Sequence, residues 1–261
     1  MQSTIESIGR MQPYGFAHIA ALVFTVAAAV LLVLAARRVR GTPLEHRALA
    51  VAGWFMLVTS VAWIGWEMLP ANWDIERSLP FHLSDALRII TSLALITRSG
   101  WAIVVSYYWG LTLNIQSVLT PDLSYAHLVP LEYAEYWFVH IVALLTPIVF
   151  VWGLGYRPTW RGYGFSFLAT LVWAGVAGTV NALSGTNYMY LAHAPQGPSA
   201  LDLLGPWPLY ILWEIALVAS VWALITWPWT VGREGRAARA PQAQRIGRLG
   251  LVHRVPALRR Q

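Results

Sequence analysis

Residues 16–36 read FAHIAALVFTVAAAVLLVLAA, and Arg37, Arg38 and Arg40 follow directly. A helix that rises 1.5 Å per residue needs about 20 apolar residues to cross a hydrocarbon core of roughly 30 Å. The positive charges come after this run and not before it, which is unlike a cleavable signal peptide. The stretch therefore predicts a retained membrane-spanning helix.

The composition of the whole chain agrees with this reading. Of the 261 residues 57% are hydrophobic and only 11% are charged, whereas a soluble domain has about a quarter of its residues charged. The chain has no cysteine, which excludes disulfides and cysteine-ligated metals. None of its 18 basic residues is lysine, which excludes a retinal Schiff base. Membrane topology accounts for the net charge of +6, and we expect no nucleic-acid partner.

Apolar windows along the chain predict an all-α, polytopic membrane bundle of seven helices. We expect a transmembrane domain over 1–230 and an Arg-rich, disordered cytoplasmic tail over 231–261. The seven predicted spans lie near 16–36, 49–69, 81–97, 101–120, 134–153, 164–183 and 208–228.

The distribution of arginine predicts the orientation of these spans. Arginines cluster after spans 1, 3 and 5 and in the tail, whereas only Arg10 and Arg77 fall in connections on the other side. By the positive-inside rule, we expect the N-terminus outside and the C-terminus in the cytoplasm. The protein is therefore predicted to be a multi-pass protein of the cell membrane, with membrane lipid as its partner.

Polar residues inside the predicted spans gather at one depth. Ionisable groups are costly in a bilayer and usually face a cavity or a partner. With the predicted topology, almost all of them fall in the outer half, and we expect a polar cavity that opens outward. The expected lining residues are His82, Asp85, Arg88, Asn114, Gln116, Asn181, Asn187 and Glu214, and Glu67 ends span 2 on the same side.

Two of the residues at this depth form a candidate catalytic pair. Ser84 is a possible nucleophile, and His140 is the histidine at matching depth that could act as its base. Glu132 precedes His140 by eight residues on one stripe of span 5, so Glu132 or Glu135 is a candidate to orient the imidazole. Asn181 or Asn114 is a candidate to stabilise an oxyanion. This arrangement predicts a lipid acyl hydrolase or acyltransferase.

Other readings of the same residues stay open. Ser84 and Asp85 suit a helix N-terminus for capping reasons alone, and Asp85 with Arg88 could neutralise each other. A metal bound by His82, Asp85 and His140 lacks a supporting motif, so we expect no metal and no other cofactor. The alternative functions are a transporter of a polar solute and a non-catalytic lipid-binding or assembly subunit, whose protein partner the sequence does not identify.

Several ordered motifs resemble the YwaF-type bacterial integral membrane proteins. The resemblance covers roughly residues 45–228. It is carried by the runs LPFHLSD (79–85), LTPDL (119–123), FVH (138–140), GTNYMY (185–190) and LGPWP (204–208), together with Asn181. That family is distantly similar to a eukaryotic membrane acyltransferase of ether phospholipids and to the androgen-induced membrane hydrolases of fatty acid esters. The resemblance implies acyl chemistry, and His140 matches the position of the histidine in those relatives.

The nucleophile of the relatives does not map directly onto this chain. The acyltransferase has a cysteine directly before the histidine of span 3, and that position is Phe81 here. Members of the bacterial family often have cysteine where this chain has Ser84. The resemblance therefore implies Ser84 as the substitute nucleophile, three residues further along span 3.

Overall fold

The computed structural model describes residues 8–194, 200–231 and 253–254. Its main elements are long helices, with very little strand. In chain order they are α1 (Phe16–Val39), α2 (Pro43–Glu67), α3 (Leu83–Thr97), α4 (Gly100–Tyr108), the π-helix η1 (Trp109–Leu113), α5 (Asn114–Leu119), α6 (Val129–Ile148), the π-helix η2 (Val149–Gly153), α7 (Trp160–Ser184), the 3-10 turns η3 (Tyr188–Tyr190) and η4 (Ala200–Leu204), and α8 (Leu209–Thr230). The chain is a membrane helix bundle, as its composition predicts.

Six helical segments in the described part of the chain are long and apolar enough to cross a membrane. They are α1, α2, the continuous run of α4, η1 and α5, the run of α6 and η2, α7 and α8. The third predicted span is α3, which has 15 residues and would rise about 22 Å. That is less than the roughly 30 Å of a hydrocarbon core. The predicted count of seven full spans is therefore not confirmed.

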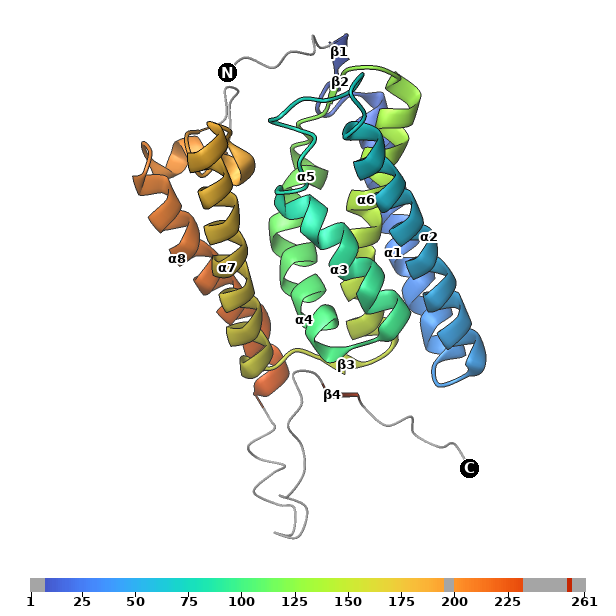
Figure 1. The fold of residues 1–261 in the computed structure, drawn as a ribbon. Helices are drawn as coiled ribbons and strands as arrows, with labels where there is room; N and C mark the ends of the chain where they lie inside the picture. The colour runs from blue at the N-terminus through green and yellow to red at the C-terminus, as the bar shows by residue number, and fades with distance from the viewer. Residues whose placement is uncertain (1–7, 195–199, 232–252, 255–261) are drawn as a thin grey trace, which may run out of the picture.

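Residues 68–82 explain why α3 is short. They descend from the end of α2 without forming a helix, and α3 begins part of the way along the bundle (Figure 1). The helix ends at Thr97, and the next residue, Arg98, adopts the left-handed conformation at φ 54° and turns the chain into α4. The polar start of α3 is thus placed within the bundle.

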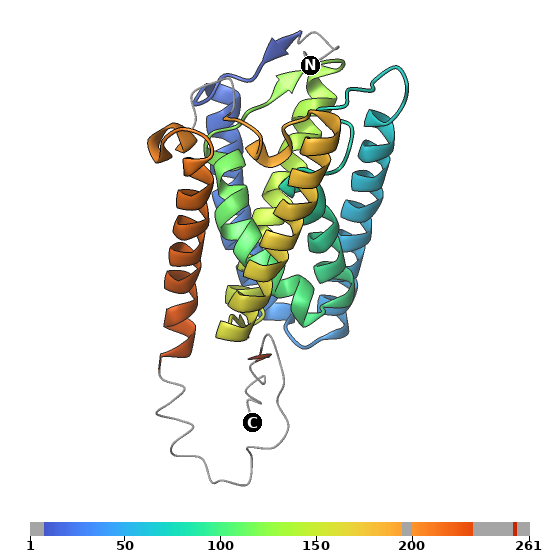
Figure 2. The ribbon, with the colours of Figure 1, turned by 60° about the vertical axis from the view of Figure 1, so that its left-hand side comes forward.

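The bundle has three parts (Figures 1 and 2). The central part contains α3 to α6; α1 packs against α6 and η2, and α2 packs against α3. The antiparallel pair of α7 and α8 attaches through the contact of α7 with α4. The start of α1 and the end of α8 lie at opposite ends of the bundle. We call the end that carries the start of α1 the outer end, in keeping with the predicted orientation, which stays a prediction.

Local signals in the sequence fix the helix ends. Thr42 caps α2 by accepting a hydrogen bond from the Glu45 amide, and Pro43 occupies the first turn. Thr159 caps α7 in the same way through the Gly162 amide. Gly185, at φ 71°, ends α7 in the left-handed conformation that glycine adopts most readily.

The central helices α4 and α6 approach each other closely at Gly110. A Cβ atom at this position would lie 2.4 Å from the carbonyl oxygen of Ala143 and 3.2 Å from Pro147. Pro147 has no N–H to offer this carbonyl, so α6 lacks one of its own hydrogen bonds there. Gly110 also lies in the π-helix η1, a feature that is frequent near functional sites. Glycine is therefore required at this crossing.

A short pair of antiparallel strands lies at each end of the bundle. At the outer end β1 (Gly9–Arg10) pairs antiparallel with β2 (Ser124–Tyr125), and Arg10 forms an ion pair with Asp122. At the inner end β3 (Tyr156–Arg157) pairs with β4 (His253–Arg254). Apart from Val231 and β4, the predicted disordered tail lies outside the described residues.

Candidate functional site

A buried arginine connects α3 with α6. Arg88 donates from Nη1 to Glu135 Oε1 at 2.6 Å, and its Nη2 lies 3.7 Å from Asp85 Oδ1. All three side chains are largely buried, so one guanidinium is shared by two carboxylates. Removing one member of such a group would leave an uncompensated buried charge, which is expensive in a low-dielectric core. The predicted Asp85–Arg88 pair is present, and Glu135 extends it.

His140 is held by a reciprocal pair of hydrogen bonds with Asn114. The Nδ1 atom of His140 lies 2.7 Å from Asn114 Oδ1, and Asn114 Nδ2 donates to the His140 carbonyl oxygen at 2.9 Å. The amide oxygen can only accept, so Nδ1 carries the proton. The ring of Tyr136 packs at a centroid distance of 4.3 Å. This arrangement leaves Nε2 as the basic nitrogen of a fixed imidazole.

The first turn of α3 carries three of the predicted residues. His82 is the N-cap, and its amide donates to Asp85 Oδ2 at 3.0 Å. The His82 ring packs against Tyr188 at a centroid distance of 4.9 Å. Ser84 follows in the same turn and is partly buried; its hydroxyl has no hydrogen-bond partner in the described part of the chain. The structure shows no hydrogen bond between Ser84 and His140.

Glu132 has another environment than the one predicted for it. Its carboxylate accepts hydrogen bonds from the amides of Ala126, His127 and Leu128 at 2.8, 2.6 and 3.0 Å. The His127 ring nitrogen Nδ1 is 3.7 Å away. Glu132 thus fixes the loop before α6 and is not brought together with His140. Glu135 is not either, because it binds Arg88.

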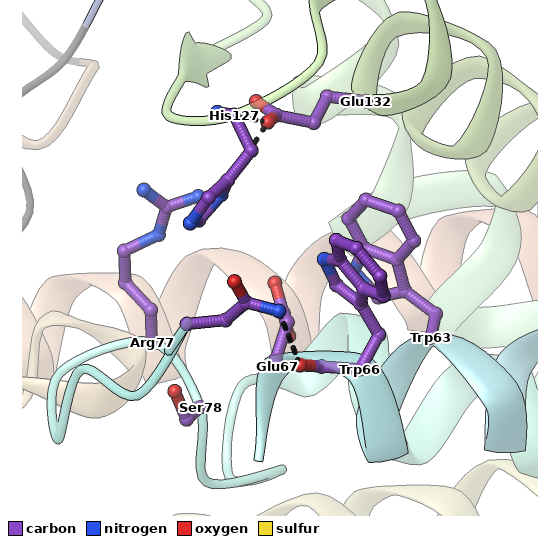
Figure 3. Close-up of a pocket in the computed structure, with 8 residues that line it drawn as sticks. Trp63, Trp66, Glu67, Arg77, Ser78, His127 and Glu132 are labelled. Atoms are coloured by element: carbon purple, nitrogen blue, oxygen red, sulfur yellow. Dashed lines mark hydrogen bonds and ion pairs between the residues drawn. The ribbon is translucent and has the colours of Figure 1, made fainter. Parts of the chain in front are cut away.

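A small pocket at the outer end is lined by residues from α2, from the connection that follows it, from the loop before α6 and from the first turn of α6 (Figure 3). In Figure 3, the side chains of Glu67, Arg77 and His127 point toward one another, and the indoles of Trp63 and Trp66 form one wall. Asn72, Ser78 and Glu132 complete the lining. None of the eight residues predicted to line an outward-opening cavity lines this pocket; of its residues, sequence reasoning had named for the site only Glu67 and Glu132. The predicted cavity stays a prediction.

The outer pocket and the buried ion pairs are electrostatically connected. Glu67 is close enough to interact with the charges of Asp85, Arg88 and Glu135 as well as with Arg77. Arg88 in turn is close enough to influence His140. Long-range electrostatic interactions therefore link Glu67 in the pocket with Arg88, and Arg88 with His140.

Asn181 and Asn187 organise the connection that follows α7. Asn181 Nδ2 donates to the Tyr188 carbonyl at 2.9 Å, and its Oδ1 accepts from Thr186 and from the Tyr188 amide. Asn187 is exposed, and its Oδ1 accepts the amides of Ala192 and His193. The hydrogen bonds of Asn181 thus lie within this connection, and none joins it to Ser84 or His140 among the described residues. The oxyanion role of Asn181 stays a prediction.

Tyr188 attaches this loop to the segment before α3. Its hydroxyl donates to the Ile75 carbonyl and accepts from the Leu79 amide at 3.2 Å. Burial raises the pKa of the Tyr188 phenol to about 12, although the Leu79 amide acts in the opposite direction. The phenol therefore stays protonated and keeps donating at any physiological pH.

The remaining predicted residues lie apart from these contacts. Gln116 is exposed on α5, and Glu214 is half-buried on α8 without a hydrogen-bond partner among the described residues. Sequence reasoning did not select Trp63, Trp66 and His127 for the site. The spacing of Trp63, Trp66 and Glu67 places them on one helical face and could have drawn attention to the first two. No helical pattern reveals His127, because a loop conformation positions it.

Two comparisons with known proteins give matches. The model of the TMEM164 family matches residues 13–226. An uncharacterized protein of Treponema pallidum (strain Nichols) is 27% identical over 193 residues, which are 74% of this chain and 79% of that protein. No solved structure matches. These matches do not confirm the YwaF-type resemblance. Because the family model matches most of its length, the chain belongs to the TMEM164 family of membrane proteins.

Proposed function

We propose that this protein is an acyl-transfer enzyme of the cell membrane that acts on lipid esters. The observation that carries the proposal is the reciprocal pair of His140 and Asn114, which presents one imidazole nitrogen as a base inside a membrane bundle. An asparagine that orients the histidine in this way replaces the carboxylate that other catalytic triads use. The acyl chemistry implied by the sequence resemblance supports the same conclusion.

In the proposed reaction Ser84 is the nucleophile. Its hydroxyl attacks the ester carbonyl, His140 Nε2 takes the hydroxyl proton, and His140 then returns this proton to the departing alcohol. The position of Ser84 in the first turn of α3 supports this role, because the positive end of the helix dipole there can stabilise a developing oxyanion. Ser84 must move or rotate toward His140 before this step.

A fluorophosphonate probe added to the detergent-purified protein tests the nucleophile. We expect labelling of the wild type and none of Ser84→Ala, whereas Ser220→Ala, an exposed serine on α8, labels normally. Replacing His140 with alanine should reduce the labelling rate about 10²- to 10⁴-fold, as is usual for loss of a general base. Equal labelling of Ser84→Ala and wild type would exclude Ser84 as the nucleophile.

A second candidate function is lipid binding without catalysis. It is favoured by the absence of a hydrogen bond between Ser84 and His140 in the described structure. In that case, cells that carry Ser84→Ala with His140→Ala have the lipid composition of the wild type, whereas a deletion strain does not. A transport function has less support, because Phe150, Leu154, Ile103 and other apolar side chains fill the inner half of the bundle.

A further inference from the structure

Several polar groups in the core have no hydrogen-bond partner among the described residues. Four of them lie on α2, α3 and α4: the hydroxyls of Ser60, Thr91 and Ser106, and the Nε atom of Arg88. The three hydroxyl residues are 0% exposed, and Arg88 is 6% exposed. Ser92, on the same helix, donates to the carbonyl one turn earlier, as buried helical hydroxyls usually do.

The packing of α2 against α3 places two of these groups at one level. A Cβ atom on Gly53 of α2 would lie 2.8 Å from the Cβ atom of Leu95 on α3, which fixes the register of the two helices. The helices are antiparallel neighbours (Figure 1). Ser60 lies two turns beyond Gly53 and Arg88 two turns before Leu95, both toward the outer end. Ser60 and Arg88 therefore lie at one level of the interface.

We call these polar groups of Ser60, Arg88 and Thr91 at the interface of α2 and α3 the polar layer. The same register places Thr91 one turn further inward than Ser60 and Arg88. Thr91 follows Arg88 on α3, and its counterpart on α2 is Met56, which precedes Ser60 by one turn and is 0% exposed. Outward, Glu67 lies two turns beyond Ser60 on the same face of α2 and lines the outer pocket. The layer thus begins at an opening to solvent and ends in the core.

A buried donor or acceptor without a partner destabilises a protein, and internal water is the usual partner where direct contacts are missing. We propose that ordered water molecules extend from the outer pocket past Arg88 to Thr91. They bind the hydroxyls of Ser60 and Thr91 and the Nε atom of Arg88. The guanidinium then has partners on all of its nitrogens: two carboxylates and water.

For the proposed function, on which this last step rests, the water would be the acyl acceptor. Ser84 lies one turn before Arg88 on the same face of α3. The water oxygen attacks the carbonyl carbon of the acyl ester on Ser84, and His140 Nε2 takes one proton from this water. The bond to Ser84 Oγ breaks, and Oγ receives that proton. A free fatty acid and the original serine result, so the enzyme is a hydrolase.

Radiolytic labelling detects the water without any need for turnover. The purified full-length chain is equilibrated in ¹⁸O-water and exposed to a short X-ray pulse, which forms hydroxyl radicals from bound as well as bulk water. We expect oxidation of Met56 although it is 0% exposed. Trp222 is the control, since it is also 0% exposed and Thr112 already satisfies its indole N–H. If Met56 is as unreactive as Trp222, the interface is dry and the inference is wrong.

The sign of a stability change provides a second test. If the hydroxyls bind water, Ser60→Ala and Thr91→Val each lower Tm by about 2–4 °C. If they are dry and unpaired, their removal relieves a penalty and Tm stays the same or rises. Ser220→Ala, on the exposed face of α8, should leave Tm unchanged. A dry interface in both tests leaves the proposed acyl-transfer function open, because neither measurement depends on Ser84 or His140.

Discussion

At the scale of single residues, Asn114 is the side chain on which the proposed base depends. Replacing Asn114 with alanine removes the acceptor that fixes the imidazole of His140, so the ring can adopt the wrong tautomer. We expect kcat for ester cleavage to fall about 10- to 100-fold with KM little changed. This is the usual loss of activity when a residue that orients a metal-binding histidine is mutated, and Asn114 orients His140 in the same way. The matched control is Gln116→Ala, two residues away and exposed. Equal activity of both variants contradicts the orienting role.

Arg88 is the residue whose loss should affect folding most. Arg88→Met leaves the buried carboxylates of Glu135 and Asp85 without their counter-charge. The free energy of unfolding should fall by about 3–5 kcal/mol, which denaturation in mild detergent measures.

The double variant Arg88→Met with Glu135→Leu separates charge from packing. It removes one uncompensated carboxylate together with the arginine, so it should be more stable than Arg88→Met alone. If the two variants are equally stable, the ion pair contributes little, and the effect of Arg88→Met comes from lost packing.

The sequence predicts which residues are polar and buried better than it predicts their partners. The spacing of Asp85 and Arg88 on one helix correctly placed them together. Glu132 and His140 share a helical stripe in the same way, yet Glu132 binds three loop amides. Periodicity describes one helix, whereas the partner of Glu132 depends on the conformation of 126–128 and that of His140 on the approach of α5. Neither can be derived from spacing.

At the scale of elements, the crossing of α4 and α6 controls the geometry of the pair. Gly110→Ala would place a methyl group against the Ala143 carbonyl oxygen, and backbone cannot yield as a side chain can. We expect a loss of about 1–3 kcal/mol in the free energy of unfolding, the usual cost of overpacking, and a fall in activity since Asn114 is one turn away.

Gly175→Ala on α7 is the matched control for this glycine. A Cβ atom there meets nothing within 4 Å, and alanine is the better helix former, so the stability should not decrease. If Gly110→Ala is as stable as Gly175→Ala, the close approach of α4 and α6 does not constrain the fold.

The positions of the helices along the chain were more predictable than their depth in the bundle. Apolar runs located all of the long helices, and Thr42, Pro43 and Gly185 mark their ends by known chemistry. The third span is the exception. The predicted 81–97 agrees with α3 (Leu83–Thr97) to within two residues, but its polar start is not the outer end of a full crossing, because 68–82 enter the bundle without forming a helix. The side-chain contacts of Tyr188 that hold this segment come from more than a hundred residues later.

At the scale of the whole molecule, the predicted orientation can be tested directly because the chain has no cysteine. Single cysteines at the exposed positions Ala71 and Arg161 lie at opposite ends of the bundle. We expect a membrane-impermeant maleimide to label Ala71→Cys in intact cells and Arg161→Cys only after permeabilisation, as arginine-rich connections stay in the cytoplasm. The reverse pattern would place the outer pocket on the cytoplasmic side.

The attachment of Tyr188 has a mechanical consequence for the entry of large hydrophobic molecules. Its hydroxyl ties the connection after α7 to Ile75 and Leu79, a few residues before the turn that carries Ser84. An acyl chain that enters laterally from the bilayer and displaces α7 and α8 outward would strain these two hydrogen bonds of Tyr188. The strain would be passed to the first turn of α3, so that in the proposed reaction the entry of a substrate and the alignment of Ser84 would be one coupled movement.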